Sequence, residues 1–262
     1  MNLFELFVKI GADTTEANKG IDEVGQKTSG LGEKLKSGLA TAGKVAVAGV
    51  AAGATAIGAL GTKAVAAYAD YEQLVGGVET LFKDSQDQVM DYANNAYKAA
   101  GLSANEYMET VTSFSASLLQ SLDGDTSAAA DKANLAITDM SDNANKMGTD
   151  MTSIQNAYQG FAKSNYTMLD NLKLGYGGTQ AEMERLLADA EKISGIKYDI
   201  SSYADIVDAI HVVQTEMGIT GTTAEEAAST IQGSFGMMKS AWQNLVTGMA
   251  DPDQDLGALV GN

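Results

Sequence analysis

The apolar segment 39–69 constrains the fold more than any other part of the chain. It reads LATAGKVAVAGVAAGATAIGALGTKAVAAYA, and the stretch between Lys44 and Lys63 carries no charge. As a helix, that stretch would extend about 27 Å, close to the ~30 Å hydrocarbon thickness of a bilayer. Ala and Gly also let helix backbones approach closely, and Gly49 and Gly53 fit the small-xxx-small pattern. The segment therefore predicts a helix that either enters a membrane, over residues 45–62, or packs against other helices.

We expect five residues of this segment to form its helix-packing or membrane-facing surface. They are Val45, Gly49, Gly53, Ile57 and Leu60.

The rest of the chain predicts an all-α fold with one short strand at its N-terminus. The only proline is Pro252, which favours long uninterrupted helices because proline removes an amide donor and clashes in helix interiors. Leu3–Ile10 is aromatic and β-branched with partial alternation, as in a strand. Three capping boxes are predicted to begin helices, at Ser103–Glu106, Thr179–Glu182 and Thr223–Glu226. The last helix carries an apolar stripe spaced three and four residues apart: Phe235, Met238, Trp242, Leu245 and Met249.

Charge divides the sequence near Asp70. Residues 1–69 have a net charge of +1, whereas residues 70–262 have a net charge of −18. We expect a short strand or arm over 1–11, and over 12–69 an amphipathic helix followed by the apolar helix. An acidic helical domain should span 70–250. Residues 251–262 read as a tail, and we expect the sequence to be the front part of a longer protein.

The candidates for chemistry are few. His211 is the only histidine and cysteine is absent, so neither a multi-histidine metal site nor thiolate chemistry can be built. His211 is interpreted as a helix residue with no catalytic role. The glycine-rich stretch 173–179 could hold an anion at a helix N-terminus, but it lacks the ending of a P-loop and is interpreted as a structural turn. Asp139, Asp142 and Asn143 lack the spacing of an EF-hand loop and are interpreted as capping and solvated surface. We therefore expect no catalytic residue, metal or cofactor.

Several long runs of this sequence resemble one family. They are LFELFVKIGADTTEANKGIDEVG, YADYEQLVGGVETLF, AGLSANEYMETVTSFSASLLQSLDGD, ITDMSDNANKMGTDMTSIQNAYQGFAKSNYTMLDNLKLGYGGTQAEMERLL and ADIVDAIHVVQTEMGITGTTAEEAASTIQGS. Together they are similar to the N-terminal region of tail tape measure proteins of long-tailed bacteriophages and prophages of Gram-positive hosts. The resemblance covers about residues 3–250. Family members usually run to many hundreds of residues, so this sequence departs from them in length.

The resemblance implies a structural protein of the virion and not an enzyme. Tape measure proteins occupy the lumen of the tail tube, where they template its assembly and length, and their apolar segments are thought to help the genome pass the host membrane. The implied partners are the tail-tube protein, tail assembly chaperones, distal tail and tip proteins, further copies of the chain, and the host membrane at infection. Assembly would take place in the bacterial cytoplasm. A small-molecule substrate is not expected, and the acidic charge disfavours sequence-specific binding of nucleic acid.

Two other classes of protein remain open. A helical pore-forming toxin also hides an Ala/Gly-rich segment in a helical body, although residues 1–11 lack the basic n-region of a secretory signal. A tail-associated cell-wall hydrolase would need paired carboxylates, and no pair stands out in this acidic sequence. Lysis of vesicles would favour the toxin, and peptidoglycan zymography would identify the hydrolase.

Overall fold

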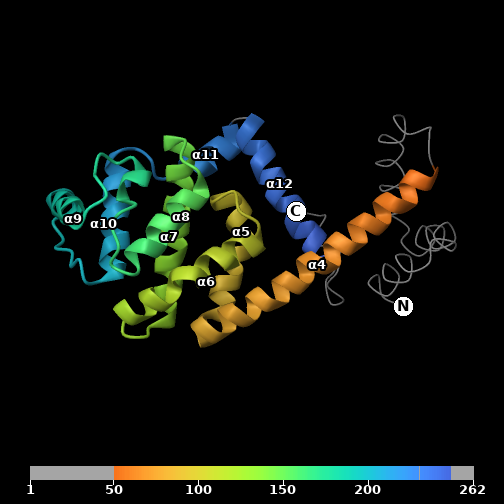
Figure 1. Ribbon diagram of the computed structural model, residues 1–262, viewed down its shortest axis with the longest axis horizontal. Helices are drawn as coiled ribbons and strands as arrows, with labels where there is room; N and C mark the ends of the chain where they lie inside the picture. Colours follow the sequence, from red (N-terminus) through yellow and green to blue (C-terminus); the bar gives the residue numbers. More distant parts are fainter. Residues whose placement is uncertain (1–49, 230, 249–262) are drawn as a thin grey trace. The chain divides into compact units, whose positions relative to one another are not determined.

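The computed structural model describes residues 50–229 and 231–248, and over these residues the fold is all-α, as the sequence predicts (Figure 1). The expected strand Leu3–Ile10, the amphipathic helix after residue 12 and the tail 251–262 lie outside the described residues. The α-helices are α4 (Val50–Phe82), α5 (Gln86–Ala99), α6 (Ala104–Ser121), α7 (Thr126–Met147), α8 (Met151–Phe161), α9 (Gln180–Ser194), α10 (Tyr203–Glu216), α11 (Thr222–Ser229) and α12 (Ile231–Gly248). Two short 3-10 helices lie between them: η2 (Lys83–Ser85) between α4 and α5, and η3 (Leu169–Leu172) between α8 and α9.

Helix α4 continues from the apolar segment into the acidic part of the chain without a break. It has 33 residues and passes through Asp70, where the charge changes. The chain divides into two compact units inside this helix: one holds Met1–Tyr71 with Leu245–Asn262, and the other holds Glu72–Asn244. The change in net charge therefore falls within a continuous helix and not in a linker.

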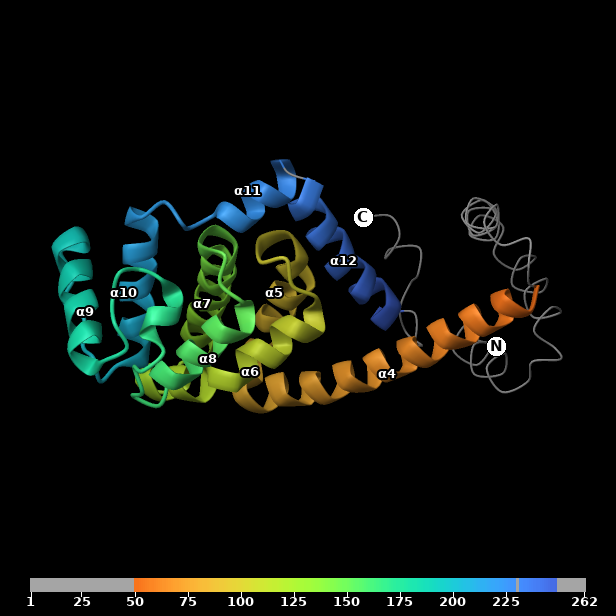
Figure 2. The ribbon, with the colours of Figure 1, turned by 45° about the horizontal axis from the view of Figure 1, so that its top comes forward.

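Helix α7 is the central helix of the unit Glu72–Asn244. It contacts α5, α6, α8, α10 and α11, and Figure 2 shows these helices arranged around it. Its apolar side is made mostly of alanine, with Ala129, Ala133, Ala136 and Met140 fully buried. Small side chains at spacings of four and three allow neighbouring helices to pack closely on α7.

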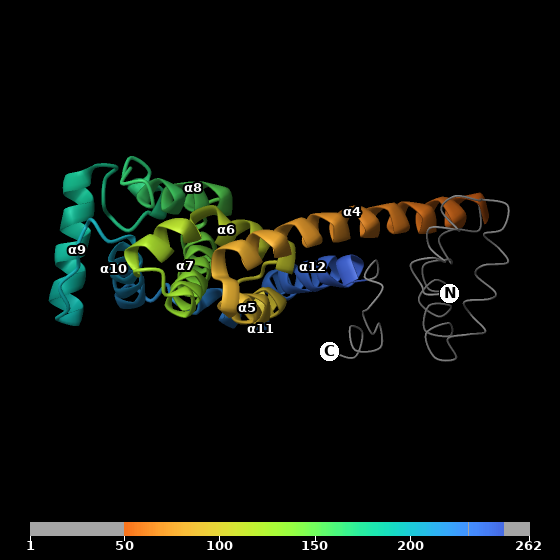
Figure 3. The same cartoon turned by 90° about the horizontal axis from the view of Figure 1, so that it is seen from below.

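Helices α9 and α10 pack against each other at one end of this unit, and they lie side by side in Figures 1 and 3. Helix α10 buries Ile206, Val207 and Ile210 on its inward face. Met217, the C-cap residue that follows Glu216, is 45% exposed.

The starts of α6 and α9 show how far the predicted capping boxes form. Ser103 forms the predicted capping box with Glu106 at the start of α6. At α9 only half of the predicted box forms: Thr179 Oγ1 accepts from the amide of Glu182 at 3.2 Å, but the Glu182 carboxylate accepts from the amide of Gly177 at 2.9 Å.

The third predicted box is wrong. Thr223 lies inside the first turn of α11, which begins at Thr222, and the amide of Thr223 donates to Asp142 of α7. A carboxylate distant in the sequence therefore replaces the local cap.

Helix α12 exposes part of its predicted apolar stripe. Met238 is 57% exposed and Trp242 is 54% exposed, whereas Ser240 is buried. Ser240 donates to the carbonyl of Gly101 at 2.6 Å, and Asn244 accepts from the amide of Ala104 at 2.8 Å. Polar contacts thus attach α12 to the start of α6, and they turn part of the apolar stripe toward solvent.

Candidate functional site: the polar face of helix α7

The C-terminal half of α7 buries a group of polar side chains that we call the α7 polar face: Asp139, Ser141, Asp142 and Asn143. Asn143 follows the buried stripe of α7 at the next helical spacing, three residues after Met140. Buried polar groups must find hydrogen-bond partners, because leaving one unpaired costs about 1–3 kcal/mol. Each of these four side chains contacts a different segment of the chain, so the face connects α7 to its surroundings.

Asp139 holds His211 of α10. His211 Nδ1 donates to the Asp139 carboxylate, at 2.9 Å from Oδ1 and 3.0 Å from Oδ2. The side chain of Asp139 is 1% exposed and that of His211 is 30% exposed. Beside them, Lys132 of α7 forms an ion pair with Asp208 of α10. These two polar contacts join the same pair of helices.

The pKa values of Asp139 and His211 are both raised, for different reasons. Burial raises the pKa of Asp139, and the hydrogen bond from His211 offsets part of that rise. The hydrogen bond to Asp139 raises the pKa of His211, while burial lowers it in part. The carboxylate also fixes the imidazole with its Nδ1 as donor. Within the described residues, Asp139 is the only hydrogen-bond partner of the His211 side chain.

A buried tyrosine, Tyr158, lies near Asp139. Tyr158 is fully buried, and burial raises its pKa well above 10.0, with the negative charge of Asp139 as a smaller cause. Gln214 lies close enough to lower the pKa of Tyr158 in part, although its side chain and the Tyr158 hydroxyl do not meet the geometry of a hydrogen bond. At neutral pH the hydroxyl of Tyr158 is therefore protonated and neutral.

Asp142 caps helix α11 from a distance. Its two carboxylate oxygens accept from the amide of Gly221 at 2.6 Å and from the amide of Thr223 at 2.8 Å. The first amides of a helix have no partner within it and favour negative charge. Asp142 is completely buried, so it supplies these amides with hydrogen-bond acceptors away from water. The predicted capping role of Asp142 is therefore correct, but the predicted solvated surface is wrong because the side chain is buried.

The remaining two side chains of the face reach backbone carbonyls. Ser141 Oγ donates to the carbonyl of Ala100 at 2.5 Å, just after α5. Asn143 Nδ2 donates to the carbonyl of Leu172 in η3 at 3.0 Å. The α7 polar face therefore joins α10, α11, η3 and the end of α5 to one central helix. This arrangement supports a structural role for the face.

The glycine-rich turn before α9 is held by its own charged neighbours. Arg185 Nη2 donates to the carbonyl of Gly175 at 2.7 Å, and its guanidinium pairs with Glu182 at 2.6 Å. Glu182 in turn accepts from the amide of Gly177 at 2.9 Å. The amide that could have held an anionic ligand is thus occupied by a carboxylate of the chain. A structural turn, as interpreted from the sequence, accounts for each of these contacts.

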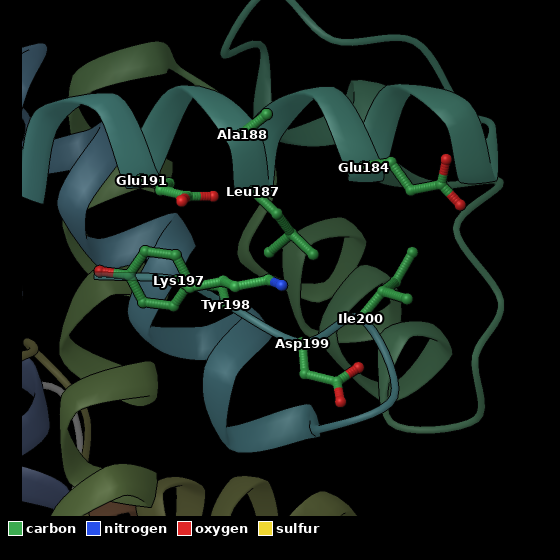
Figure 4. Close-up of a pocket in the computed structure, with 8 residues that line it drawn as sticks. All are labelled: Glu184, Leu187, Ala188, Glu191, Lys197, Tyr198, Asp199 and Ile200. Carbon is green, nitrogen blue, oxygen red and sulfur yellow. The ribbon is translucent and has the colours of Figure 1, made fainter. Parts of the chain in front are cut away.

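An open groove of about 590 Å³ lies between α9 and the segment Lys197–Ile200. Figure 4 shows Leu187 pointing from α9 toward this segment, with Glu184 and Glu191 on either side of it along the helix. Tyr198 and Ile200 complete the lining from the opposite side. The sequence did not predict the groove, because periodicity within α9 does not show how the segment after it folds back beside the helix.

The predicted packing residues are only partly within the described residues. Gly53, Ile57 and Leu60 lie in α4 at spacings of four and three, on one side of the helix, whereas Val45 and Gly49 lie outside the described residues. Over 50–229 and 231–248, none of the helices combines the length and the hydropathy needed to cross a membrane. Over the same residues, acidic and histidine side chains do not gather into a group that could hold a metal ion.

Comparison with protein-family models, curated proteins and solved structures finds no match for this chain. Its function is therefore inferred from its own sequence and from the geometry described above.

Proposed function

We propose that this chain is the N-terminal region of a tail tape measure protein, a structural component of a long-tailed bacteriophage or prophage. The observation that carries the proposal is the set of long sequence runs, spread over about residues 3–250, that resemble this family. Because the runs are long and cover nearly the whole chain, they are more specific than a short motif.

The helical structure is compatible with this role. Helix α4 has 33 residues, which corresponds to a continuous rod of about 50 Å. Gly53, Ile57 and Leu60 follow one side of the rod, where small and aliphatic residues favour close helix packing. In the proposed role, this side packs against other tape measure helices in the tail tube.

The unit Glu72–Asn244 would act in the same assembly as a folded body. Its central helix α7 is joined to four neighbouring segments by the α7 polar face, and such a body contributes less length than an extended helix. The acidic charge of residues 70–262 would repel the phosphates of DNA, which suits a component of a conduit through which DNA passes.

The experiment is genetic and structural, in the phage or prophage that carries the gene. An early stop codon should abolish tails of defined length in electron micrographs, and a synonymous change at the same codon should leave them unchanged. Peptides from 72–244 should be detected by mass spectrometry in purified tails. Normal tails in the stop-codon mutant would refute the proposal.

An in-frame deletion of 72–244 then tests how this unit contributes to length. As a fully extended helix, these residues would span about 260 Å. Because they fold into a compact unit, we expect the deletion to shorten tails by far less. Shortening by the full amount would show that the unit is extended in the tail.

A further inference from the structure

Several buried polar atoms of α7, α8 and α10 have no protein partner within the described residues. Gln214 of α10 is completely buried, and neither its Nε2 nor its Oε1 makes a hydrogen bond there. The hydroxyl of Tyr158 in α8 and Oδ1 of Asn143 in α7 are unpaired in the same way. Buried polar groups nearly always have a partner, which is either a protein group or an ordered water. The unpaired atoms of these three helices therefore mark a polar site inside the helical unit.

The packing of α7 against α10 brings two of these side chains to one level. The ion pair and the hydrogen bond between the two helices use residues that rise in number along both, so α7 and α10 run in the same direction past each other. Asn143 lies four residues after Asp139 on α7. Gln214 lies three residues after His211 on α10. At these spacings a side chain lies on the same side of its helix, one turn further along, so Asn143 faces α10 and Gln214 faces α7 just beyond this pair.

Tyr158 approaches the same place from α8. Helix α8 packs against α7, and Tyr158 is completely buried. The charge of Asp139 raises the pKa of Tyr158 and the side chain of Gln214 lowers it, both as smaller causes than burial, so the hydroxyl lies near both groups. Its geometry toward Gln214 is not that of a direct hydrogen bond. A molecule that both donates and accepts can satisfy the two groups together.

The chemistry of the site favours water as the bound molecule. The unpaired atoms comprise an amide nitrogen that donates, carbonyl oxygens that accept and a hydroxyl that does both. A buried water typically makes about three hydrogen bonds to polar groups that would otherwise be unsatisfied. His211 already contacts both oxygens of Asp139, so a cation would gain no free carboxylate there. An anion would be repelled by the charge of Asp139.

We propose that one or more ordered water molecules bind inside the protein between α7, α8 and α10, hydrogen-bonded to Gln214, Tyr158 and Asn143. The water supplies the hydrogen-bond partners of these side chains, and it connects α8 to α10. Because the surrounding side chains are buried, exchange of this water with solvent requires the helices to separate locally. The site does not depend on the function proposed above.

A crystal structure of the full chain, at a resolution that shows ordered water, tests the proposal directly. We expect electron density for water about 2.7–3.2 Å from the side-chain amide of Gln214, with a second contact to the Tyr158 hydroxyl or to Asn143. A Gln214 amide that instead bonds directly to Tyr158, with no water within this distance, would overturn the proposal.

Magnetic relaxation dispersion of the solvent oxygen nuclei gives a second test in solution, because it counts water molecules held inside a protein for longer than its tumbling time. Gln214→Met replaces the buried amide by an apolar side chain of similar length and should remove at least one long-lived water. Tyr158→Phe, which deletes only the hydroxyl, should also lower the count. Circular dichroism checks that each variant is folded, and if one fails to fold the other carries the comparison.

The matched control is Gln155→Met. The amide of Gln155 already donates to Thr110 Oγ1 at 2.9 Å, so this variant should keep the water count of the parent. A count that is unchanged in the folded Gln214 and Tyr158 variants, or that falls equally in the control, would contradict a water site at these atoms.

Discussion

Replacement of Asp142 by alanine should be among the most destabilising single changes on helix α7. The change removes two hydrogen bonds between a buried carboxylate and the amides of Gly221 and Thr223. Hydrogen bonds to charged groups contribute about 1.5–3 kcal/mol each. The change also removes a buried charge, which recovers part of the desolvation cost. We therefore expect a net loss of about 3 kcal/mol in the free energy of unfolding, or a fall in Tm of roughly 6–12 °C.

The assay is chemical denaturation followed by circular dichroism, with hydrogen exchange at the amides of Gly221 and Thr223. The matched control is Asp150→Ala, which removes the exposed N-cap of α8, where Asp150 Oδ1 accepts from the amide of Ser153 at 3.1 Å. This control should cost about 1 kcal/mol. Exchange at the two amides should accelerate in the Asp142 variant and stay unchanged in the control. If Asp142→Ala is no more destabilising than Asp150→Ala, distant capping does not stabilise α11 as argued.

Three further outcomes follow from the structure. Because its hydrogen bond raises the pKa of His211 above 6.5, the charged pair stabilises the fold below that pH and loses its effect as pH rises through the folded pKa. His211→Gln, which keeps a neutral donor, should therefore destabilise the chain more near pH 5.5 than near pH 9, and an equal loss at both would contradict this. Gly178→Ala should lower the free energy of unfolding by about 3 kcal/mol or more, because the new Cβ would lie 2.2 Å from the carbonyl oxygen of Thr167. Gly236→Ala, in a helix with open space around it, should instead raise the free energy of unfolding by about 0.5–1 kcal/mol. Denaturant midpoints of the two variants measure the difference. Fluorescence of Trp242, the only tryptophan, should be red-shifted and quenched by acrylamide because the side chain is 54% exposed, and a blue-shifted, unquenched emission would show that a partner covers it.

Local signals in the sequence account for several of the helix ends that the structure shows. Ser103 caps α6 as predicted, and Asp150 caps α8 in the same way, because in each case the side chain and the amide it binds are three residues apart. Gly148 and Gly195 end α7 and α9 with positive φ, a conformation that glycine adopts easily. Each of these features depends on a few adjacent residues, so tertiary contacts have little opportunity to change it.

Tertiary contacts decided the points that sequence analysis missed. The apolar stripe of α12 predicts burial of Met238 and Trp242, yet the hydrogen bonds of Ser240 and Asn244 orient the helix so that both are exposed. Periodicity identifies which residues share a face, but it does not identify which face has a partner. The groove beside α9 was missed for a similar reason, since the residues of one wall say nothing about the wall opposite.

The α7 polar face shows how such contacts could be anticipated. Asp142 and the amide of Gly221 are 79 residues apart in the chain, so a search for local caps cannot pair them. One signal was present in the sequence, since Asn143 continues the alanine-rich stripe of α7. The start of α11 gave no such signal, because the predicted box Thr223–Glu226 pointed to a local cap, whereas the structure begins the helix at Thr222, just after Gly221. A central helix is covered by neighbours on several sides, so a polar residue that continues its buried stripe must be satisfied by another element. A helix start without a local cap is the natural place to look for that partner, because its free amides favour a carboxylate.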